Sequence, residues 1–372
     1  MKESGVPMEV VFPEIQKLFG FGMMRLPMIG DQVDIPQTIQ MVDAFLAAGF
    51  HYFDTAHGYI GGQSEQAVKT CLTARYPRDR YILTNKLSNN FFDRQEDIRP
   101  LFQTQLDACG VDYFDFYLMH AQSAERFEKY TRCRAYETAL ELKAEGKIRH
   151  LGISFHDSPQ VLDKILTAYP QIEVVQLQFN YLDYDDPRVQ SFGCYEVCRK
   201  HGKPVFVMEP VKGGSLVKLP EQAQRIFDGL NSGSNASLAI RFAAGFPCVR
   251  TVLSGMSTLE QLEENVAFMK DFQPLTAQEN AAVEQVRGIL RGQGLIPCTG
   301  CRYCTEVCPM EIPIPDLFAC LNDKWRTGSA DTSEISGGKP GDCVRCGKCE
   351  EICPQQLNIR GLMLSVRGEL GL

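Results

Sequence analysis

Residues 114–154 read FDFYLMHAQSAERFEKYTRCRAYETALELKAEGKIRHLGIS, two short apolar runs separated by a stretch of helical length. The first run (114–120) and the second (148–154) are short, apolar and bounded by polar residues, as buried strands are. Between them, AYETALELKAEG (135–146) ends on Gly146, a residue type that stops helices in the left-handed conformation. The segment therefore predicts a strand, a helix and a second strand of a parallel sheet.

The same alternation extends from about residue 17 to residue 270. Further stretches of helical length are IPQTIQMVDAFLAAG (35–49) and RQEDIRPLFQTQLDACG (94–110). The remaining strand candidates are LFGFG (18–22), YFD (52–54), YILT (81–84), VVQLQFN (174–180), PVFVMEP (204–210) and CVRTVLS (248–254). Eight strands with intervening helices over about 250 residues predict an α/β fold, a (β/α)8 TIM barrel, rather than an open doubly wound sheet.

The composition of the chain changes after residue 271. There DFQPLTAQENAAVEQVRGILRG (271–292) predicts a connecting helix, and a cysteine-rich region follows it. We therefore expect three parts: a barrel domain over residues 1–272, a connecting helix over 273–296 and a small cysteine-rich domain over 297–372.

The C-terminal region contains the spacing C-x2-C-x2-C-x3-C-P twice, in CTGCRYCTEVCP (298–309) and CVRCGKCEEICP (343–354). Three thiolates at this spacing can bind one corner of an iron–sulfur cubane, and the fourth ligates the other cluster in two-cluster ferredoxins. We therefore expect two [4Fe–4S] clusters, one on Cys298, Cys301, Cys304 and Cys353, the other on Cys343, Cys346, Cys349 and Cys308. Structural zinc is the weaker alternative, because zinc sites use two C-x2-C pairs rather than two quartets. A module that has lost its metal is also weaker, because no cysteine is missing.

The composition excludes several classes of protein. Hydrophobic residues make up 44% and charged residues 23% of the 372 residues, so the chain can bury a sizeable core. The net charge of −8 offers no basic face for nucleic acid. No apolar run approaches the length of a membrane helix, and MKESGVPMEVVFPE lacks the order of a signal peptide. We expect a cytoplasmic protein without a membrane or nucleic-acid partner.

Seven cysteines lie outside the two motifs and, without a secretion signal, are expected to be mostly buried thiols. They are Cys71, Cys109, Cys133, Cys194, Cys198, Cys248 and Cys320. Cys194 and Cys198 are four residues apart on a predicted helix and are a candidate ligand pair, but packing is the favoured interpretation.

Polar side chains stand at the C-terminal ends of four predicted strands. They are Asp54, Lys86, His120 and Ser154, and Tyr59 lies in the loop after Asp54. Because active sites of such barrels lie at the C-terminal ends of the strands, the first three and Tyr59 are expected to meet in one pocket. A single histidine after an apolar strand is more often structural, but four such groups together favour a catalytic site.

The segment GFHYFDTAHGYIGGQSE (49–65) resembles the signature segment of the aldo-keto reductases. Its spacing to TNK (84–86) and LMH (118–120) matches that family's tetrad of Asp, Tyr, Lys and His. This resemblance covers about residues 17–270, and residues 297–360 resemble a bacterial-type dicluster ferredoxin. The combination is similar to the aldo-keto reductase-like proteins that carry a C-terminal dicluster ferredoxin domain.

The resemblance implies a role for each member of the tetrad. Tyr59 is then the general acid, and Lys86 and Asp54 are the ion pair that tunes it. A neighbouring cation stabilises a phenolate, so the tyrosine proton can move as hydride reaches the carbonyl carbon. By the same resemblance Asp54 keeps Lys86 charged, and His120 orients the carbonyl and donates to the developing alkoxide.

The resemblance also implies a nicotinamide cofactor, NAD(H) or NADP(H), although this chain departs from the family's pattern. Ser154 and Gln176 fall where the family holds the carboxamide, but the expected asparagine after the serine is Phe155, followed by His156. Met208 stands in place of the usual stacking tyrosine. Its smaller side chain leaves room for a different ring, which makes a flavin the second candidate cofactor.

The segment SGMSTLEQLEEN (254–265) resembles the family's adenosine-binding segment, with Glu264 and Asn265 in the adenine positions. Gly255 and Gln261 stand where NADP-preferring relatives have a lysine and an arginine for the 2′-phosphate. The missing cations predict that NADH binds at least as well as NADPH. The nearby cations that could substitute are Arg250 and Lys270.

The leading interpretation is an iron–sulfur oxidoreductase of the aldo-keto reductase type that reduces a small-molecule carbonyl or related acceptor. A ferredoxin or flavoprotein is the candidate electron partner. An iron–sulfur cluster passes single electrons, whereas a nicotinamide transfers a hydride. Either the clusters therefore exchange electrons in a separate reaction, or a flavin or a radical-tolerant substrate mediates between clusters and nicotinamide. The alternatives are a nicotinamide-dependent carbonyl reductase with structural clusters, and a non-catalytic redox sensor or electron-transfer adaptor, which the intact tetrad disfavours.

Overall fold

The structure is a computed structural model that describes residues 12–230, 232–333 and 335–372. Residues 1–11 of the expected barrel domain lie outside the described residues. The chain forms two compact units. The first contains residues 12–185, 190–210 and 236–276, and the second contains residues 186–189, 211–235 and 277–372.

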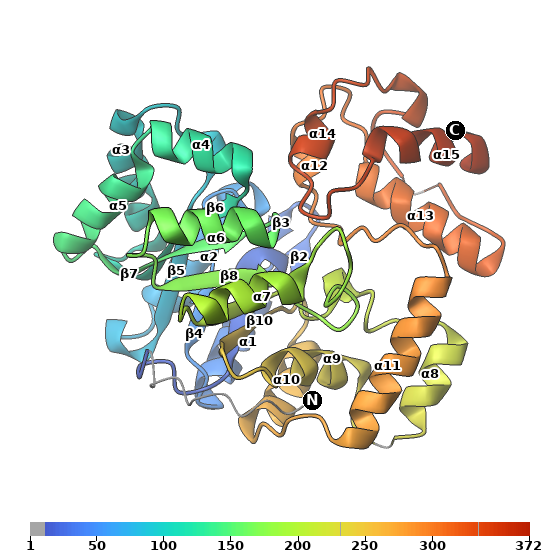
Figure 1. The fold of residues 1–372 in the computed structure, drawn as a ribbon, viewed down its shortest axis with the longest axis horizontal. Helices are drawn as coiled ribbons and strands as arrows, with labels where there is room; N and C mark the ends of the chain where they lie inside the picture. The colour runs from blue at the N-terminus through green and yellow to red at the C-terminus, as the bar shows by residue number, and fades with distance from the viewer. Residues whose placement is uncertain (1–11, 231, 334) are drawn as a thin grey trace. The chain divides into compact units, whose positions relative to one another are not determined.

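The first unit is built on a closed barrel of eight parallel strands, in the neighbour order β1-β10-β9-β8-β7-β6-β5-β4 (Figure 1). The strands are β1 (Phe19–Gly22), β4 (Tyr52–Asp54), β5 (Ile82–Leu87), β6 (Phe114–Gln122), β7 (Ile148–Phe155), β8 (Val174–Gln178), β9 (Val205–Met208) and β10 (Val249–Gly255). A short hairpin of β2 (Met28–Ile29) and β3 (Gln32–Val33) follows β1. The predicted (β/α)8 barrel is therefore confirmed, and each predicted strand overlaps an observed one.

Helices follow the strands along the chain, as a parallel barrel requires. Those of the first unit are α1 (Ile35–Ala47), α2 (Gln63–Val68), α3 (Gln95–Cys109), α4 (Ala124–Arg132), α5 (Ala135–Ala144), α6 (Pro159–Ala168), α7 (Ser191–Lys200), α9 (Asn235–Ala244) and α10 (Leu259–Lys270). Gly110 ends α3 with a φ of 66°. Gly146 follows α5 with a φ of 77°, the left-handed conformation predicted for it. In the described ranges, no helix is long and apolar enough to cross a membrane.

Packed side chains fill the interior of the barrel. The interior cluster consists of Phe12, Tyr52, Ile82, Phe116, Leu118, Val174, Phe206 and Leu253. Gly152 on β7 makes this packing sterically feasible, because a Cβ there would lie 2.5 Å from Val174 and 2.6 Å from Leu118. Since the interior is closed by these side chains, the chemistry of the barrel belongs at the C-terminal ends of its strands.

The second unit contains α8 (Glu221–Asp228), α11 (Ala277–Gly292), α12 (Tyr303–Glu306), α13 (Ile314–Thr327), α14 (Lys348–Glu351) and α15 (Ile359–Leu370). The connecting helix expected from the sequence corresponds to α11, which packs against α8. The region of the cysteine motifs has its own apolar core, in which Phe318, Leu321 and Val366 are fully buried.

The loop after β9 belongs to this second unit although its sequence lies within the barrel. Lys212 is buried, and its Nζ donates to Gln355 Oε1 at 3.2 Å. Gly213 has a φ of 61°, and a Cβ on it would lie 2.3 Å from the carbonyl oxygen of Thr299. Thr299 follows Cys298 and Gln355 lies two residues after Cys353, so this loop packs directly on the cysteine region.

The seven cysteines outside the motifs are all buried free thiols, as predicted. Cys194 and Cys198 lie on α7, and burial raises the pKa of both thiols. A raised pKa favours the neutral thiol over the thiolate that binds metal. The favoured interpretation of this pair, packing rather than ligation, agrees with this environment.

Candidate active site and iron–sulfur sites

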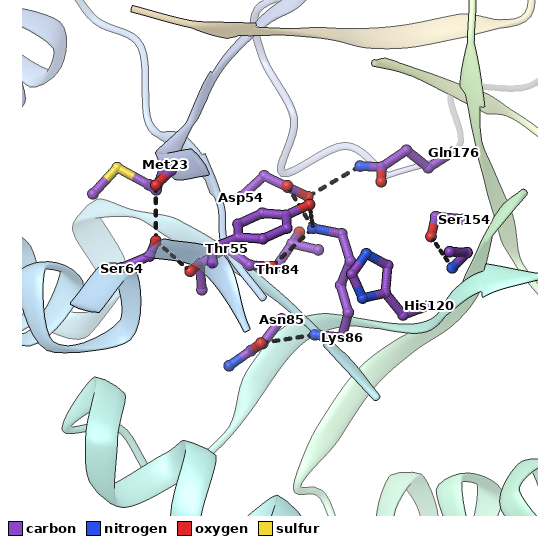
Figure 2. Close-up of polar contacts among 12 residues, drawn as sticks. Met23, Asp54, Thr55, Ser64, Thr84, Asn85, Lys86, His120, Ser154 and Gln176 are labelled. Carbon is purple, nitrogen blue, oxygen red and sulfur yellow. Dashed lines mark hydrogen bonds and ion pairs between the residues drawn. The ribbon is translucent and has the colours of Figure 1, made fainter. Parts of the chain in front are cut away.

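The ends of three neighbouring strands bring Asp54, Lys86 and His120 of the predicted tetrad together (Figure 2). Asp54 ends β4, Lys86 lies near the end of β5 and His120 near the end of β6. Tyr59 follows β4 in a short turn in which Ile60 adopts a left-handed φ of 53°. The ring centroids of Tyr59 and His120 are 5.9 Å apart and the rings are nearly perpendicular.

Lys86 is the centre of this arrangement. Its fully buried Nζ lies 2.6 Å from Asp54 Oδ1, 2.8 Å from the carbonyl oxygen of Thr55 and 3.2 Å from Tyr59 Oη. Burial lowers the pKa of Lys86, and the adjacent Asp54 carboxylate acts in the opposite direction. Three oxygens thus use the three donors of one ammonium group, which fixes its position next to the phenol.

Asp54 is held from both sides. Its second oxygen, Oδ2, accepts a hydrogen bond from Gln176 Nε2 at 3.0 Å, and the side chains of Asp54 and Gln176 are both buried. Gln176 lies on β8, across the barrel from β4. Hydrogen bonds to both oxygens restrain the rotation of the Asp54 carboxylate.

His120 is paired with Ser88, whose Oγ lies 2.6 Å from His120 Nδ1. Burial and the positive charges of Lys86 and Arg126 lower the pKa of His120 well below its usual value. The ring is therefore neutral at physiological pH. A neutral ring that accepts from the Ser88 hydroxyl at Nδ1 carries its proton on Nε2, and this tautomer can donate to a substrate oxygen.

A second layer of polar contacts supports these residues (Figure 2). Ser64 Oγ donates to the carbonyl oxygen of Met23 at 2.9 Å and lies 2.7 Å from Thr55 Oγ1. Asn85 Oδ1 accepts from the backbone nitrogen of Lys86 at 2.8 Å. These contacts fix the backbone on either side of the ion pair.

Sequence reasoning missed Ser88 and Thr55, although the sequence carries a signal for Ser88. Ser88 directly follows the last residue of β5 and lies two residues after Lys86, and alternate residues of an extended segment point to the same face. Thr55 contributes its backbone carbonyl, a group that every residue carries and that no sequence pattern reveals.

Two residues expected to hold a nicotinamide carboxamide lie on neighbouring strands, Ser154 on β7 and Gln176 on β8. Both are buried. Ser154 Oγ accepts from the backbone nitrogen of Ala121 at 2.7 Å. In the described part of the chain no hydrogen bond engages Gln176 Oε1 or the Ser154 hydroxyl proton, and an amide group complements that pair of atoms. Met208 ends β9 and is half-buried.

The expected adenosine-binding residues lie at the end of β10 and on α10. Asn265 is buried, and its Nδ2 donates to Ser254 Oγ at 3.3 Å, whereas Glu264 is exposed. The Thr258 side chain caps the first turn of α10 by accepting from the backbone nitrogen of Gln261. The positive end of this helix follows a barrel strand, an arrangement that suits a phosphate group.

The structure places an unpredicted cation, Arg25, beside the expected adenosine-binding segment. A Cβ on Gly255 would lie 3.1 Å from the Cβ and Cδ atoms of Arg25, so the arginine side chain runs along this glycine. Ser257 Oγ donates to the carbonyl oxygen of Arg25 at 2.9 Å. Glu209 Oε1 lies 3.7 Å from Arg25 Nη2. The candidate cations proposed from the sequence did not include this residue.

The motif cysteines line two cavities in the second unit. One is lined by Cys308, Cys343, Cys346 and Cys349. The other is lined by Cys298, Cys301, Cys304 and Cys353. Each cavity combines three cysteines of one motif with the fourth cysteine of the other. Four cysteines lining one cavity supply the donor types of a [4Fe–4S] cluster, so the residues fit that cofactor.

The barrel with its buried Asp, Tyr, Lys and His, together with the two cysteine quartets, defines an oxidoreductase with an iron–sulfur module. The model of the Aldo/keto reductase family matches residues 18–287. The model of the 4Fe-4S dicluster domain matches residues 297–357 and supports iron–sulfur clusters in this region. The chain belongs to the aldo/keto reductase family and carries a 4Fe-4S dicluster domain, as the resemblance implied.

Curated relatives match the barrel part of the chain. The NADH-specific methylglyoxal reductase of Escherichia coli (strain K12) is 28% identical over 276 residues, which cover 61% of this chain and 81% of that protein. The L-galactose dehydrogenase of Arabidopsis thaliana is 25% identical over 293 residues, covering 73% of this chain and 89% of that protein. Both names describe oxidoreductases, in agreement with the enzyme class predicted from the sequence.

Solved structures share the fold. The holo form of an aldo-keto reductase from Bacillus halodurans aligns with a TM-score of 0.59 and 26% identity, covering 72% of this chain and 91% of that one. An aldo-keto reductase from Klebsiella pneumoniae in complex with NADPH aligns with a TM-score of 0.60. Its identity of 19%, over 73% of this chain and 90% of that one, supports the likeness of the fold alone.

Proposed function

We propose that the barrel reduces the carbonyl group of a small molecule, with Tyr59 as the proton donor. The observation that carries this proposal is the position of Lys86 Nζ, 2.6 Å from Asp54 Oδ1 and 3.2 Å from Tyr59 Oη. An ammonium group at this distance stabilises the phenolate that remains after Tyr59 gives up its proton. Asp54 keeps the buried ammonium group charged, since burial alone favours its neutral form.

Two donors converge on the carbonyl oxygen in this proposal. Tyr59 Oη protonates the oxygen, and His120 Nε2 donates a hydrogen bond that holds it in place. The neutral state of His120 matters, because a charged imidazolium would compete with Lys86 for the phenolate. Ser88 orients the ring through Nδ1.

The residues present fit a nicotinamide cofactor, which when bound supplies a hydride to the carbonyl carbon. Ser154 and Gln176 bind its carboxamide in this proposal, and Met208 packs against its ring. Gly255, Glu264 and Asn265 bind the adenosine end. A flavin remains the second candidate because Met208 replaces the aromatic residue that the family stacks on nicotinamide.

Each of the two cavities of the second unit holds one [4Fe–4S] cluster in this proposal, with the crossed ligand sets described above. The clusters serve one-electron exchange with a ferredoxin or flavoprotein. Cys346 is exposed, whereas the other seven motif cysteines are buried or half-buried. A cluster ligand at the surface favours electron exchange with a partner over a purely structural cluster.

The experiment that tests carbonyl reduction compares Tyr59→Phe with Tyr76→Phe in the anaerobically purified protein. Tyr76 lies in the same unit but hydrogen-bonds to Asp43 near the surface, so its variant controls for loss of a phenol elsewhere. With methyl pyruvate or methylglyoxal as acceptor and NADH as donor, Tyr59→Phe should lower kcat by roughly 10²–10⁴, the usual contribution of a general acid. Full activity in Tyr59→Phe would remove the proposed mechanism.

A further inference from the structure

Three side chains at or just after the ends of β6 and β7 have hydrogen-bond donors or acceptors that bind no other described residue. They are His120, Arg126 and His156. Arg126 lies in the first turn of α4, directly after β6, and His156 follows the last residue of β7. All three are half-buried. They lie at the strand ends that carry the candidate active site.

A hydrogen bond holds the Arg126 side chain in place, but no ion pair balances its charge among the described residues. Its Nη1 donates to the carbonyl oxygen of Ala121 at 2.6 Å, and Ala121 is the residue directly after His120. Among the described residues Arg126 forms no ion pair. The nearby Asp157 uses its carboxylate to accept from the backbone nitrogens of Ala124 and Ser158. The guanidinium therefore keeps its charge and its remaining donors for a ligand.

His156 is held by its backbone, whose nitrogen donates to the carbonyl oxygen of Gln122 at 2.9 Å. Its ring forms no hydrogen bond to any residue in the described ranges. Burial and the charge of Arg126 lower the pKa of His156 to about 3. The same charge lowers the pKa of His120. Arg126 is thus close to both rings, and both rings are neutral.

The two cations near His120, Lys86 and Arg126, differ in their partners. The Lys86 ammonium is compensated by Asp54, whereas Arg126 has no carboxylate partner in the described part of the chain. A half-buried guanidinium that forms no ion pair and lies near two neutral imidazoles favours an anion, and the planar fork of arginine suits a carboxylate.

We propose that Arg126 and His156 bind the carboxylate of the substrate, which makes 2-oxo acids the substrate class of this enzyme. The inference rests on the proposed carbonyl reduction. Because Arg126 is bonded to the residue next to His120, the carboxylate site adjoins the site of the carbonyl oxygen. A bound nicotinamide would supply the hydride that adds to carbon 2 as its C=O π bond breaks. The oxygen takes the Tyr59 proton, and the product is a 2-hydroxy acid with its carboxylate unchanged.

The test measures binding separately from turnover. Oxamate has the carboxylate and carbonyl of a 2-oxo acid but is not reduced, and methyl oxamate lacks the charge. Calorimetry on the nicotinamide-saturated holoprotein should show oxamate binding about 10- to 100-fold more tightly than methyl oxamate, the range of hydrogen bonds to a charged group. Equal affinities, or no binding of oxamate, would overturn the proposal.

Three variants test which residues cause the preference for oxamate over methyl oxamate. Arg126→Gln and His156→Asn should each remove most of the preference for oxamate and leave the affinity for methyl oxamate unchanged. Arg132→Gln, at the exposed end of the same helix, is the matched control and should keep the preference. Equal losses for both ligands in Arg126→Gln and in His156→Asn would assign these residues a purely structural role and contradict the proposal.

Measurements of turnover separate the proposed carboxylate site from the proposed carbonyl reduction by Tyr59. In wild-type protein kcat/KM should be higher for pyruvate than for methyl pyruvate, and Arg126→Gln should reverse that order. Reduction of methyl pyruvate that depends on Tyr59, without any preference for oxamate, would sink the carboxylate site alone. A preference for oxamate in a protein whose activity ignores Tyr59 would sink the mechanism and leave the carboxylate site standing.

Discussion

Gln176 Nε2 donates a 3.0 Å hydrogen bond to Asp54 Oδ2, which joins a proposed cofactor residue to the ion pair of the proposed catalytic group. The two side chains come from β8 and β4 and are both buried. The opposite oxygen of Asp54 binds Lys86. Binding of a carboxamide at Gln176 Oε1 and the charge state of Lys86 are therefore linked through one carboxylate.

This linkage predicts that Gln176→Met affects both cofactor affinity and kcat. The Kd for NADH should rise and kcat should fall, each by about tenfold, because the variant removes a carboxamide partner and a hydrogen bond to a charged group. Stopped-flow titration and steady-state kinetics measure the two effects. Gln103→Met, on the exposed face of α3, should change neither. A change in Kd with kcat unaltered would show that Gln176 binds cofactor without acting on Asp54.

The lowered pKa of His120 predicts the pH dependence of activity. Because burial and two nearby cations disfavour the protonated ring, His120 stays neutral above and well below pH 6.5. The profile of kcat/KM for a neutral carbonyl substrate should therefore show no ionisation near pH 6.5. A loss of activity with an apparent pKa close to 6.5 that disappears in His120→Gln would contradict the assigned neutral state.

The relative affinity of the protein for NADH and NADPH can be measured directly. Because Gly255 and Gln261 replace the phosphate-binding cations of NADP-preferring relatives, NADH should bind at least as tightly as NADPH. Arg25 beside Gly255 is the residue that can reverse this expectation. A preference of tenfold or more for NADPH, worth about 1.4 kcal/mol, that is lost in Arg25→Gln would identify Arg25 as the phosphate ligand.

The two cavities predict which cluster each fourth cysteine supports. Cys353→Ser should disturb the cluster on Cys298, Cys301 and Cys304, and Cys308→Ser should disturb the other. Electron paramagnetic resonance and iron content distinguish the two losses. Cys320→Ser, a buried cysteine of α13 outside both cavities, should keep both clusters. Damage confined to each cysteine's own motif would refute the crossed ligation.

The sequence predicted the barrel and the positions of the tetrad because both depend on local patterns. Apolar runs bounded by turns identified the strands, and polar residues at strand ends identified Asp54, Lys86 and His120. Two features depend on contacts between distant segments, which local patterns do not encode. One is Arg25, which runs along Gly255 across 230 residues of chain. The other is the loop after β9, which packs on the cysteine region through Lys212 and Gly213.

The central claim, that Lys86 acts by stabilising the Tyr59 phenolate, is tested most directly by a double-mutant cycle on kcat. Lys86→Met in the wild-type background should lower kcat by roughly 10²-fold or more, since it removes the charge beside the phenol. In the Tyr59→Phe background the same change should have little further effect, because the two residues act as a unit. Additive losses in the double variant would contradict the account.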